Sequence, residues 1–195
     1  MHTAHFHPDD AAEAAMRVFW QKGYAATSIQ DLVEGTGLSR SSLYNTFESK
    51  YGLFQHALRR YHRQTAATVG LLAQDGPAIE RVRALLHSIV AEELGSESAC
   101  GCLVANTALE LGGRDSEITD LLGEHFATLE TALTAVMQRG QQQGDIAPDK
   151  SPVALARFIM ATIQGLRVLG RGNADEDRAR RLNDVVDTAV DALSG

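Results

Sequence analysis

The stretch that most constrains this chain spans residues 27–54 and reads TSIQDLVEGTGLSRSSLYNTFESKYGLF. Its apolar residues recur at helical spacing on both sides of a Gly-Thr-Gly triplet that starts at Gly35. Thr27, with Gln30 three residues later, forms a capping-box pattern and predicts the start of a helix that ends at Gly35. Because glycine adopts a positive φ at little cost, the triplet predicts a tight turn, and Ser39 predicts the N-cap of a second helix. The stretch therefore predicts two short helices joined by a turn.

The second predicted helix has two chemically different sides. Leu43 and Phe47 form its buried side. The remaining positions carry hydroxyl, amide, phenol and guanidinium groups, at Arg40, Ser41, Ser42, Tyr44, Asn45 and Thr46. Such groups hydrogen-bond to base edges and to phosphate oxygens. The pattern predicts a helix that contacts DNA.

These residues resemble the TetR family of bacterial helix-turn-helix transcriptional regulators, over roughly residues 8 to 56. The resemblance depends on Gly23-Tyr24, Thr27-Ser28-Ile29, Gly37-Leu38-Ser39, Leu43-Tyr44, Phe47, Lys50 and Leu53-Phe54. It implies a three-helix DNA-binding domain at residues 1–56 and a larger helical domain for effector binding and dimerisation at 57–195. Gln30 and Asn45-Thr46 depart from the commonest family form, so the resemblance does not imply an operator sequence.

Base contacts and phosphate contacts are expected from different residues of this stretch. Arg40 is the candidate for a bidentate contact to guanine, and Asn45 is the candidate for adenine. The matching family positions imply phosphate contacts for Ser41, Tyr44, Thr27 and Lys50. The full predicted DNA-binding set is Thr27, Ser28, Ser39, Arg40, Ser41, Ser42, Tyr44, Asn45 and Lys50.

The charge distribution agrees with a DNA partner although the net charge of the chain is −7. Residues 1–63 contain 7 Lys or Arg against 6 Asp or Glu, a balance of +1, and five histidines. Residues 64–195 contain 11 against 19, a balance of −8. The acidic excess lies in the second part of the chain, which leaves the first part able to approach phosphates.

Composition indicates a soluble cytoplasmic protein. The chain has 195 residues, of which 44% are hydrophobic and 22% charged, as in ordinary globular proteins. No apolar run reaches the roughly 18 to 20 residues of a membrane span, and no signal-peptide pattern is present. The two cysteines, Cys100 and Cys102, are too few for a disulfide scaffold or a structural zinc site. We expect no metal, no cofactor and no membrane partner.

The rest of the chain predicts an all-α fold of about nine helices. Apolar residues follow the helical i, i+3, i+4, i+7 spacing throughout, and no strand-like alternation occurs. The final two predicted helices each carry an apolar stripe. Together with the resemblance, these stripes imply a homodimer through a four-helix bundle. The predicted interface residues are Phe158, Ile163, Leu166, Val186 and Val190. An intramolecular helical hairpin is the alternative that the sequence leaves open.

The Cys100-Gly101-Cys102 segment is the most unusual feature of the second part. Gly101-Cys102-Leu103 with Asn106 resembles a minor branch of the family in which some members respond to electrophiles or oxidants. At a helix N-terminus the dipole lowers the pKa of a thiol, which favours the reactive thiolate. Free cysteines are also common as small buried residues, so the sequence leaves both packing and redox sensing open.

Several polar residues lie at or beside the apolar stripes of the second part. They are His87, Asn106, Glu110, His125 and Arg167. Pockets between bundled helices are mostly apolar with a few placed polar groups, so these residues are candidates for an effector cavity together with the two cysteines. They are equally consistent with core or rim residues whose hydrogen bonds are satisfied within the fold.

The sequence therefore predicts a homodimeric transcriptional repressor that binds a palindromic operator. A small-molecule effector or a thiol modification in the second domain would release it from DNA. The alternative from another class is a thiol enzyme that uses Cys102 with His87 or His125 as the base. We predict that the chain is not an enzyme, because no orienting third group and no oxyanion motif accompany that pair.

Overall fold

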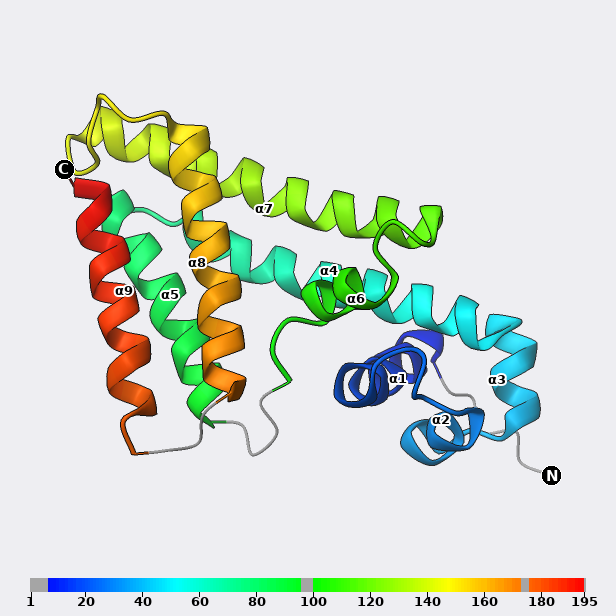
Figure 1. Cartoon of the computed structure of the whole chain (residues 1–195). Helices are drawn as coiled ribbons and strands as arrows, with labels where there is room; N and C mark the ends of the chain where they lie inside the picture. The colour runs from blue at the N-terminus through cyan, green and yellow to red at the C-terminus, as the bar shows by residue number, and fades with distance from the viewer. Residues whose placement is uncertain (1–6, 96–99, 173–175, 195) are drawn as a thin grey trace. The chain divides into compact units, whose positions relative to one another are not determined.

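The computed structural model describes residues 7–95, 100–172 and 176–194, except for the side chains of residues 67 and 68. Within these ranges the chain forms nine α-helices and no strand, as predicted (Figure 1). The helices are α1 Pro8–Lys22, α2 Ile29–Thr36, α3 Arg40–Phe47, α4 Lys50–Leu72, α5 Ala78–Gly95, α6 Leu103–Leu111, α7 Ser116–Gln143, α8 Pro152–Gly172 and α9 Arg178–Ser194. The histidine-rich segment at residues 1–7, MHTAHFH, lies outside the described residues except for His7.

The chain packs into two compact units. Of the described residues, the head unit contains 7–64 and 103–123, and the bundle unit contains 65–95, 100–102, 124–172 and 176–194. Helices α4 and α7 each contribute residues to both units. Packing thus groups α6 and the start of α7 with the helix-turn-helix. The functional division at residue 56 stays a prediction, because a packing unit and a functional domain need not share a boundary.

The start of α2 differs from the predicted cap. Ser28, not Thr27, is the N-cap: its hydroxyl accepts the Asp31 amide at 3.1 Å, and its own amide donates to the Asp31 carboxylate at 2.8 Å. Thr27 is buried, and its Oγ1 donates to the Gly23 carbonyl at 2.6 Å. The prediction was wrong by one residue because the Ser-x-x-Asp pair makes the reciprocal capping bonds that Thr-x-x-Gln was expected to make.

The turn between α2 and α3 forms as predicted, but one helical residue later. Gly37 takes the left-handed conformation, with φ of 70°, and its amide donates to the Val33 carbonyl. Gly35 stays inside α2, where a Cβ atom would lie 2.3 Å from the Val18 side chain of α1. Gly35 is therefore needed for the close approach of two helices rather than for a helix end.

Aromatic rings form the centre of the head unit. The ring of Phe19 in α1 meets that of Phe54 in α4 edge to face, with 4.9 Å between the ring centroids. The centroid of the Tyr24 ring lies 4.8 Å from that of Phe54. Trp20 is half-buried and meets Tyr61 edge to face at 5.1 Å. Such pairs stabilise by about 0.5 to 1.5 kcal/mol beyond the area that they bury. The rings thereby fix α1 against α4 beneath the helix-turn-helix.

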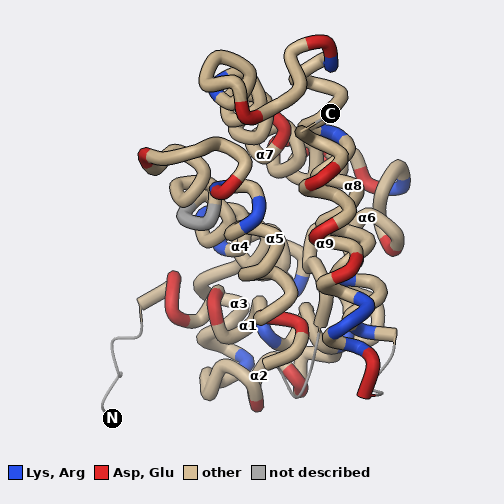
Figure 2. The backbone as a smooth tube through the Cα atoms, turned by 90° about the vertical axis from the view of Figure 1, so that its left-hand side faces the viewer, with Lys and Arg blue, Asp and Glu red and all other residues tan. Residues whose placement is uncertain are grey.

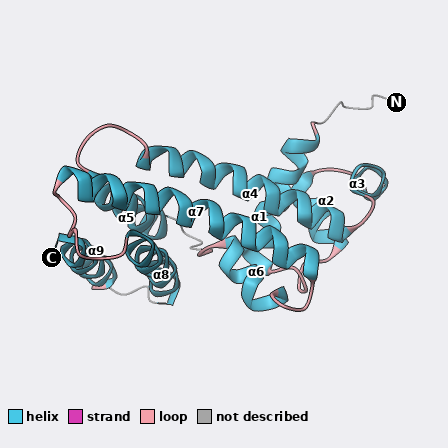
Figure 3. Ribbon diagram, turned by 90° about the horizontal axis from the view of Figure 1, so that it is seen from above, coloured by secondary structure: helices cyan, strands magenta, loops and turns pink. Residues whose placement is uncertain are grey.

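The bundle unit has a continuous aliphatic core. Helices α5, α8 and α9 pack against one another, and Figure 3 shows α8 and α9 nearly end-on, side by side. Each helix contributes residues at helical spacing, such as Val82 and Leu86 of α5, Ile159 of α8 and Leu182 of α9. The apolar stripes predicted for these helices are confirmed, because each stripe is buried in this core.

Burial corrects four of the five predicted dimer-interface residues. Ile163, Leu166, Val186 and Val190 are at most 4% exposed and belong to the core of one protomer. A side chain that is already enclosed by its own chain cannot form the surface of a partner contact. These four residues therefore belong to the core of the protomer, whereas Phe158 is 44% exposed.

Helix α8 is apolar on its outer side as well as on its core side. Its exposed hydrophobic residues are Val153, Phe158, Val168 and Leu169. By length and composition α8 also meets the criteria for a membrane span, with a mean hydropathy of 1.4, as the one such helix among the described residues. A helix that buries one side in a protein core and shows a second apolar side has this composition without a membrane.

Candidate nucleic-acid interface

Helix α3 begins at a well-formed cap. The Ser39 hydroxyl accepts the Ser42 amide at 3.1 Å, as predicted for an N-cap. It also lies 2.9 Å from the hydroxyls of Ser41 and Ser42. The first turn of α3 therefore carries three connected hydroxyls next to the positive end of the helix dipole, an arrangement suited to a phosphate oxygen.

The outer side of α3 carries the predicted base-reading residues. Leu43 and Phe47 are buried, as predicted. Arg40 and Asn45 are exposed. Their polar ends are chemically matched to the guanine and adenine edges of the major groove. Burying one side of α3 orients its other side to solvent, and this side includes Arg40, Ser41, Tyr44 and Asn45.

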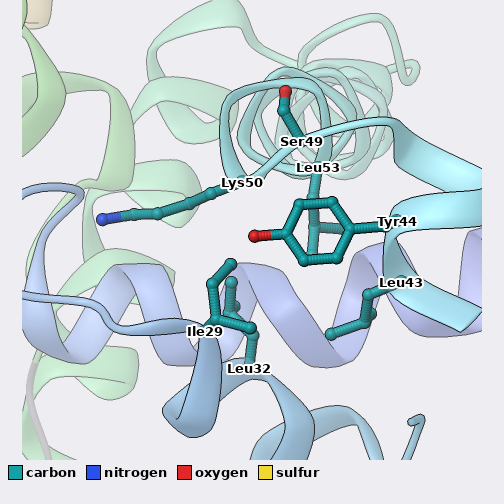
Figure 4. Close-up of a pocket in the computed structure, with 7 residues that line it drawn as sticks. All are labelled: Ile29, Leu32, Leu43, Tyr44, Ser49, Lys50 and Leu53. Atoms are coloured by element: carbon teal, nitrogen blue, oxygen red, sulfur yellow. The ribbon is translucent and has the colours of Figure 1, made fainter. Parts of the chain in front are cut away.

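A small apolar recess supports two of the candidate phosphate ligands. It is lined by Ile29, Leu32, Leu43, Tyr44, Ser49, Lys50 and Leu53, and it encloses about 10 Å³. That volume is about one water molecule, so the recess holds no ligand. Figure 4 shows the Tyr44 ring over Ile29 and the Lys50 side chain extending past it. Tyr44 is 41% exposed, and the Lys50 ammonium lies over the Tyr24 ring.

Thr27 and Ser28 differ in exposure, and therefore in whether their side chains can reach a DNA partner. Thr27 is 1% exposed and its hydroxyl is already bonded to Gly23, so its side chain is not available to a phosphate. This corrects the predicted contact. Ser28 is exposed at the N-terminus of α2, although its hydroxyl also donates to Asp31 at 2.8 Å.

The acidic residue nearest to this cap is neutralised within the head unit. Asp31 forms an ion pair with Lys22 of α1. Within this ion pair, the Lys22 ammonium donates a hydrogen bond to the Asp31 carboxylate. That bond is the main reason why the pKa of Asp31 lies well below its usual range, and hydrogen bonds from Ser28 lower it further. Elsewhere, Figure 2 shows Lys and Arg interspersed with Asp and Glu along the backbone.

The predicted effector residues are distributed over both units. His87, Cys100, Cys102, His125 and Arg167 belong to the bundle unit. Asn106 and Glu110 lie on α6 in the head unit. Their assignment to an effector cavity stays a prediction.

Their surroundings also differ within the bundle unit. His87 is exposed on α5, whereas His125 of α7 is 4% exposed. Arg167 of α8 forms ion pairs with Glu92 at 3.0 Å and with the buried Glu93 at 3.1 Å. Arg167 therefore has a structural role that its position in the sequence does not reveal.

The two cysteines precede α6 rather than lying inside it. Helix α6 begins at Leu103, Cys102 is 5% exposed, and Cys100 is half-buried. Burial raises the pKa of the Cys100 thiol, against an opposing effect of Arg171. The prediction that a helix dipole favours the thiolate is wrong for Cys100, because it lies before the helix and is partly desolvated.

Sequence reasoning missed the polar contacts that join the α6–α7 segment to the turn between α1 and α2 and to the start of α4. Glu110 accepts the backbone amides of Tyr24 and Ala25. The Tyr51 hydroxyl donates to Asp115 at 2.8 Å, and Gln55 donates to Glu117 at 2.6 Å. The partners are more than 60 residues apart in sequence, so no local pattern could have revealed them.

Comparisons with known proteins agree with this arrangement. Residues 12–57 match the family model of bacterial regulatory proteins of the tetR family, and residues 78–186 match the tetracyclin repressor-like C-terminal domain. The repressor ComR of Escherichia coli is 32% identical over 91% of this chain and 85% of its own length. The uncharacterized regulator YezE of Bacillus subtilis is 31% identical over 92% of each chain.

A solved structure extends the likeness to three dimensions. A cysteine mutant of the TetR-family transcriptional regulator CifR, complexed with a 26-base-pair operator DNA, superposes with a TM-score of 0.84. It is 32% identical, and the alignment covers 98% of this chain and 99% of that one. The helix-turn-helix, the all-α bundle and these matches over nearly the whole length agree. The chain belongs to the TetR family of bacterial transcriptional regulators.

Proposed function

We propose that this chain is a homodimeric transcriptional repressor that binds a palindromic operator. The observation that carries the proposal is the exposed side of α3, where Arg40, Ser41, Tyr44 and Asn45 face solvent from a capped helix. Base-reading and phosphate-binding groups are thus presented together. The operator-bound CifR and the repressor ComR support the DNA partner and the sign of regulation.

Dimerisation supplies the spacing that an inverted repeat requires. Two copies of α3 must reach half-sites about 34 Å apart. We propose residues 1–56 as the DNA-binding domain and residues 57–195 as the domain for dimerisation and effector binding. The outer side of α8 is the proposed contact, because it exposes Phe158 beside a recess of about 330 Å³ that is also lined by Val185 and Thr188 of α9.

The test compares Arg40→Ala with Arg59→Ala, which removes another exposed arginine of the head unit. Gel shifts would use an inverted repeat selected from the DNA beside the protein's own gene, and a scrambled version of it. Arg40→Ala should cost about 1 to 3 kcal/mol and relax the preference at one base, whereas Arg59→Ala should bind like the wild type. Equal affinity of the wild type for both DNAs would refute sequence-specific binding.

The proposed trigger is a small-molecule effector or a modification of Cys102 that changes the separation of the two recognition helices. Cys102 lies directly before α6, so an adduct there would disturb the first turn of that helix. Treatment with a quinone should release DNA from the wild type and not from Cys102→Ser. If operator binding survives complete thiol modification, the reversible small-molecule effector would be the only trigger left in this proposal.

A thiol enzyme is not part of this proposal. The relatives reported above are described as transcriptional regulators, and the buried Cys102 is better explained as a packing or sensing residue. We also propose a cytoplasmic location, because a repressor must reach its operator.

A further inference from the structure

Glu110 of α6 makes two hydrogen bonds to the turn between α1 and α2. Its Oε2 accepts the Tyr24 amide at 2.9 Å, and its Oε1 accepts the Ala25 amide at 2.6 Å. Both oxygens of one carboxylate are thus used on two consecutive backbone amides. Hydrogen bonds to a charged acceptor are roughly twice as strong as neutral ones, so this contact fixes the turn firmly.

The turn that Glu110 holds determines where the Tyr24 ring lies. The centroid of the Phe54 ring lies 4.8 Å from that of Tyr24, and the Tyr51 ring meets the Tyr24 ring edge to face at 6.4 Å. On the ring, the Lys50 ammonium lies 4.5 Å from the centroid. A cation over a tyrosine face is attracted by the ring quadrupole, so the position of Tyr24 restricts the position of the Lys50 ammonium.

A second polar contact holds the same end of α4. The Tyr51 hydroxyl donates to Asp115, which also accepts the Ile118 amide at 2.9 Å. Burial and the hydrogen bond to Asp115 raise the pKa of Tyr51 to about 12, so the phenol stays protonated and continues to donate. Tyr51 is therefore held independently of Glu110, and it supports the edge of the Tyr24 ring.

We infer that Glu110 is a positioning residue for DNA binding, which acts through Tyr24 to hold the Lys50 ammonium where it meets a phosphate. The inference deepens the proposed function and depends on it, because it takes Lys50 as a phosphate ligand. Glu110 itself need not touch DNA. Its effect would arise because, without Glu110, the Tyr24 ring would no longer hold the Lys50 ammonium at the phosphate, and much of that contact would be lost.

The test is a double-mutant cycle of Glu110→Ala and Lys50→Ala, with operator affinity measured across a salt series. Losing one phosphate contact should lower the slope of log affinity against log salt by about one. We expect this change in Lys50→Ala and much of it in Glu110→Ala. The double variant should bind within about twofold of Lys50→Ala alone, because coupled residues do not contribute additively.

Asp120→Ala is the matched control, since it removes an exposed carboxylate from the same unit and should leave both affinity and slope unchanged. Circular dichroism checks that each variant is folded. If Glu110→Ala does not fold, Glu110→Gln replaces it, because the amide keeps one acceptor for the turn. Its slope should then lie between those of the wild type and Lys50→Ala.

Two results would overturn the inference while leaving the proposed function intact. One is a normal salt slope in a folded Glu110 variant when Lys50→Ala lowers the slope. The other is a double variant whose loss equals the product of the two single losses. A normal slope in Lys50→Ala would instead overturn the phosphate contact of Lys50 and the positioning role together. Absence of any operator preference in the wild type would refute the proposed function itself.

Discussion

The head unit and the bundle unit differ in their apolar cores, which are aromatic in the first and aliphatic in the second. In the head unit, ionised side chains join distant parts of the sequence, as in the ion pair between Arg60 and Glu13 at 2.6 Å. In the bundle unit, aliphatic residues such as Leu86, Ile159 and Val186 are fully enclosed. Three carboxyls of the head unit have a lowered pKa, against Glu130 in the bundle unit. We therefore expect the stability of the head unit to depend more on pH, and that of the bundle unit more on apolar volume.

The difference suits the work proposed for each unit. A DNA-binding surface needs exposed polar groups, and the head unit has charged residues close to its small aromatic core. An effector-binding and dimerising domain needs a stable scaffold, which a large aliphatic core supplies. Single substitutions of a charged or an apolar residue in one unit should therefore show this difference most clearly.

The largest expected effect is that of a charge placed in the aliphatic core. Val186→Asp would bury a carboxylate at a position that is 0% exposed, at a cost of about 3 to 5 kcal/mol. We expect loss of the cooperative thermal transition followed by circular dichroism. Ala84→Asp, which adds the same charge at an exposed position of α5, should unfold like the wild type. Equal stability of the two variants would contradict the buried position of Val186.

The next effect distinguishes the outer side of α8 from the core. Phe158→Asp should leave the protomer folded and weaken the dimer at least about tenfold, because the residue is exposed in one chain. Sedimentation should then show the mass of one chain, 21.0 kDa, where the wild type shows twice that mass. Leu109→Asp, at an 87% exposed leucine of the head unit, serves as the control. A wild type that sediments as a monomer at micromolar concentration would disprove the dimer.

Acid should destabilise the head unit before the bundle unit. A hydrogen bond from Arg60 lowers the pKa of Glu13, one from Lys22 lowers that of Asp31, and one from the Ile118 amide lowers that of Asp115. A carboxyl with a lower pKa in the folded state contributes stability above its unfolded value, near about 4. That contribution is lost as the pH falls through the lower folded value.

The single tryptophan, Trp20, makes this measurable, because it reports on the head unit alone. Its emission should change below about pH 4, while the helical signal of the whole chain falls at lower pH. Coincident transitions would show that the two units do not differ in their response to acid.

The smallest expected effect is the change in stability when a carboxyl is replaced by an amide, and it has opposite signs in the two units. Burial raises the pKa of Glu93, despite the opposing attraction of Arg167, so its stabilising contribution is present at low pH and is lost as the pH rises through the folded value. Glu93→Gln should therefore keep or slightly raise stability at pH 7, since Arg167 retains Glu92 as a partner. Asp115→Asn, the same chemical change in the head unit, should lower it. Thermal unfolding at pH 7 checks both, and a clear loss in Glu93→Gln would refute this account.

Local sequence was sufficient to predict the helices and the character of the DNA-binding surface. Helical periodicity, Ser39 at a cap and glycine at the turn depend on residues a few positions apart, and the structure contains each of these features. The exposed side of α3 follows from the burial of Leu43 and Phe47, which the same periodicity reveals. The error at the N-cap of α2 was only one residue, because Thr27 and Ser28 are adjacent and both are suitable capping residues.

Tertiary structure decided which apolar and polar residues are available to partners. Ile163 and Val186 carry the same pattern whether they face their own chain or a second copy, and only their packing showed that they belong to the core. Glu110 resembled a cavity residue in sequence, yet it binds the turn at Tyr24, 86 residues away. Periodicity reports which side of a helix is apolar but not what lies against it, because that depends on contacts between residues far apart in the chain.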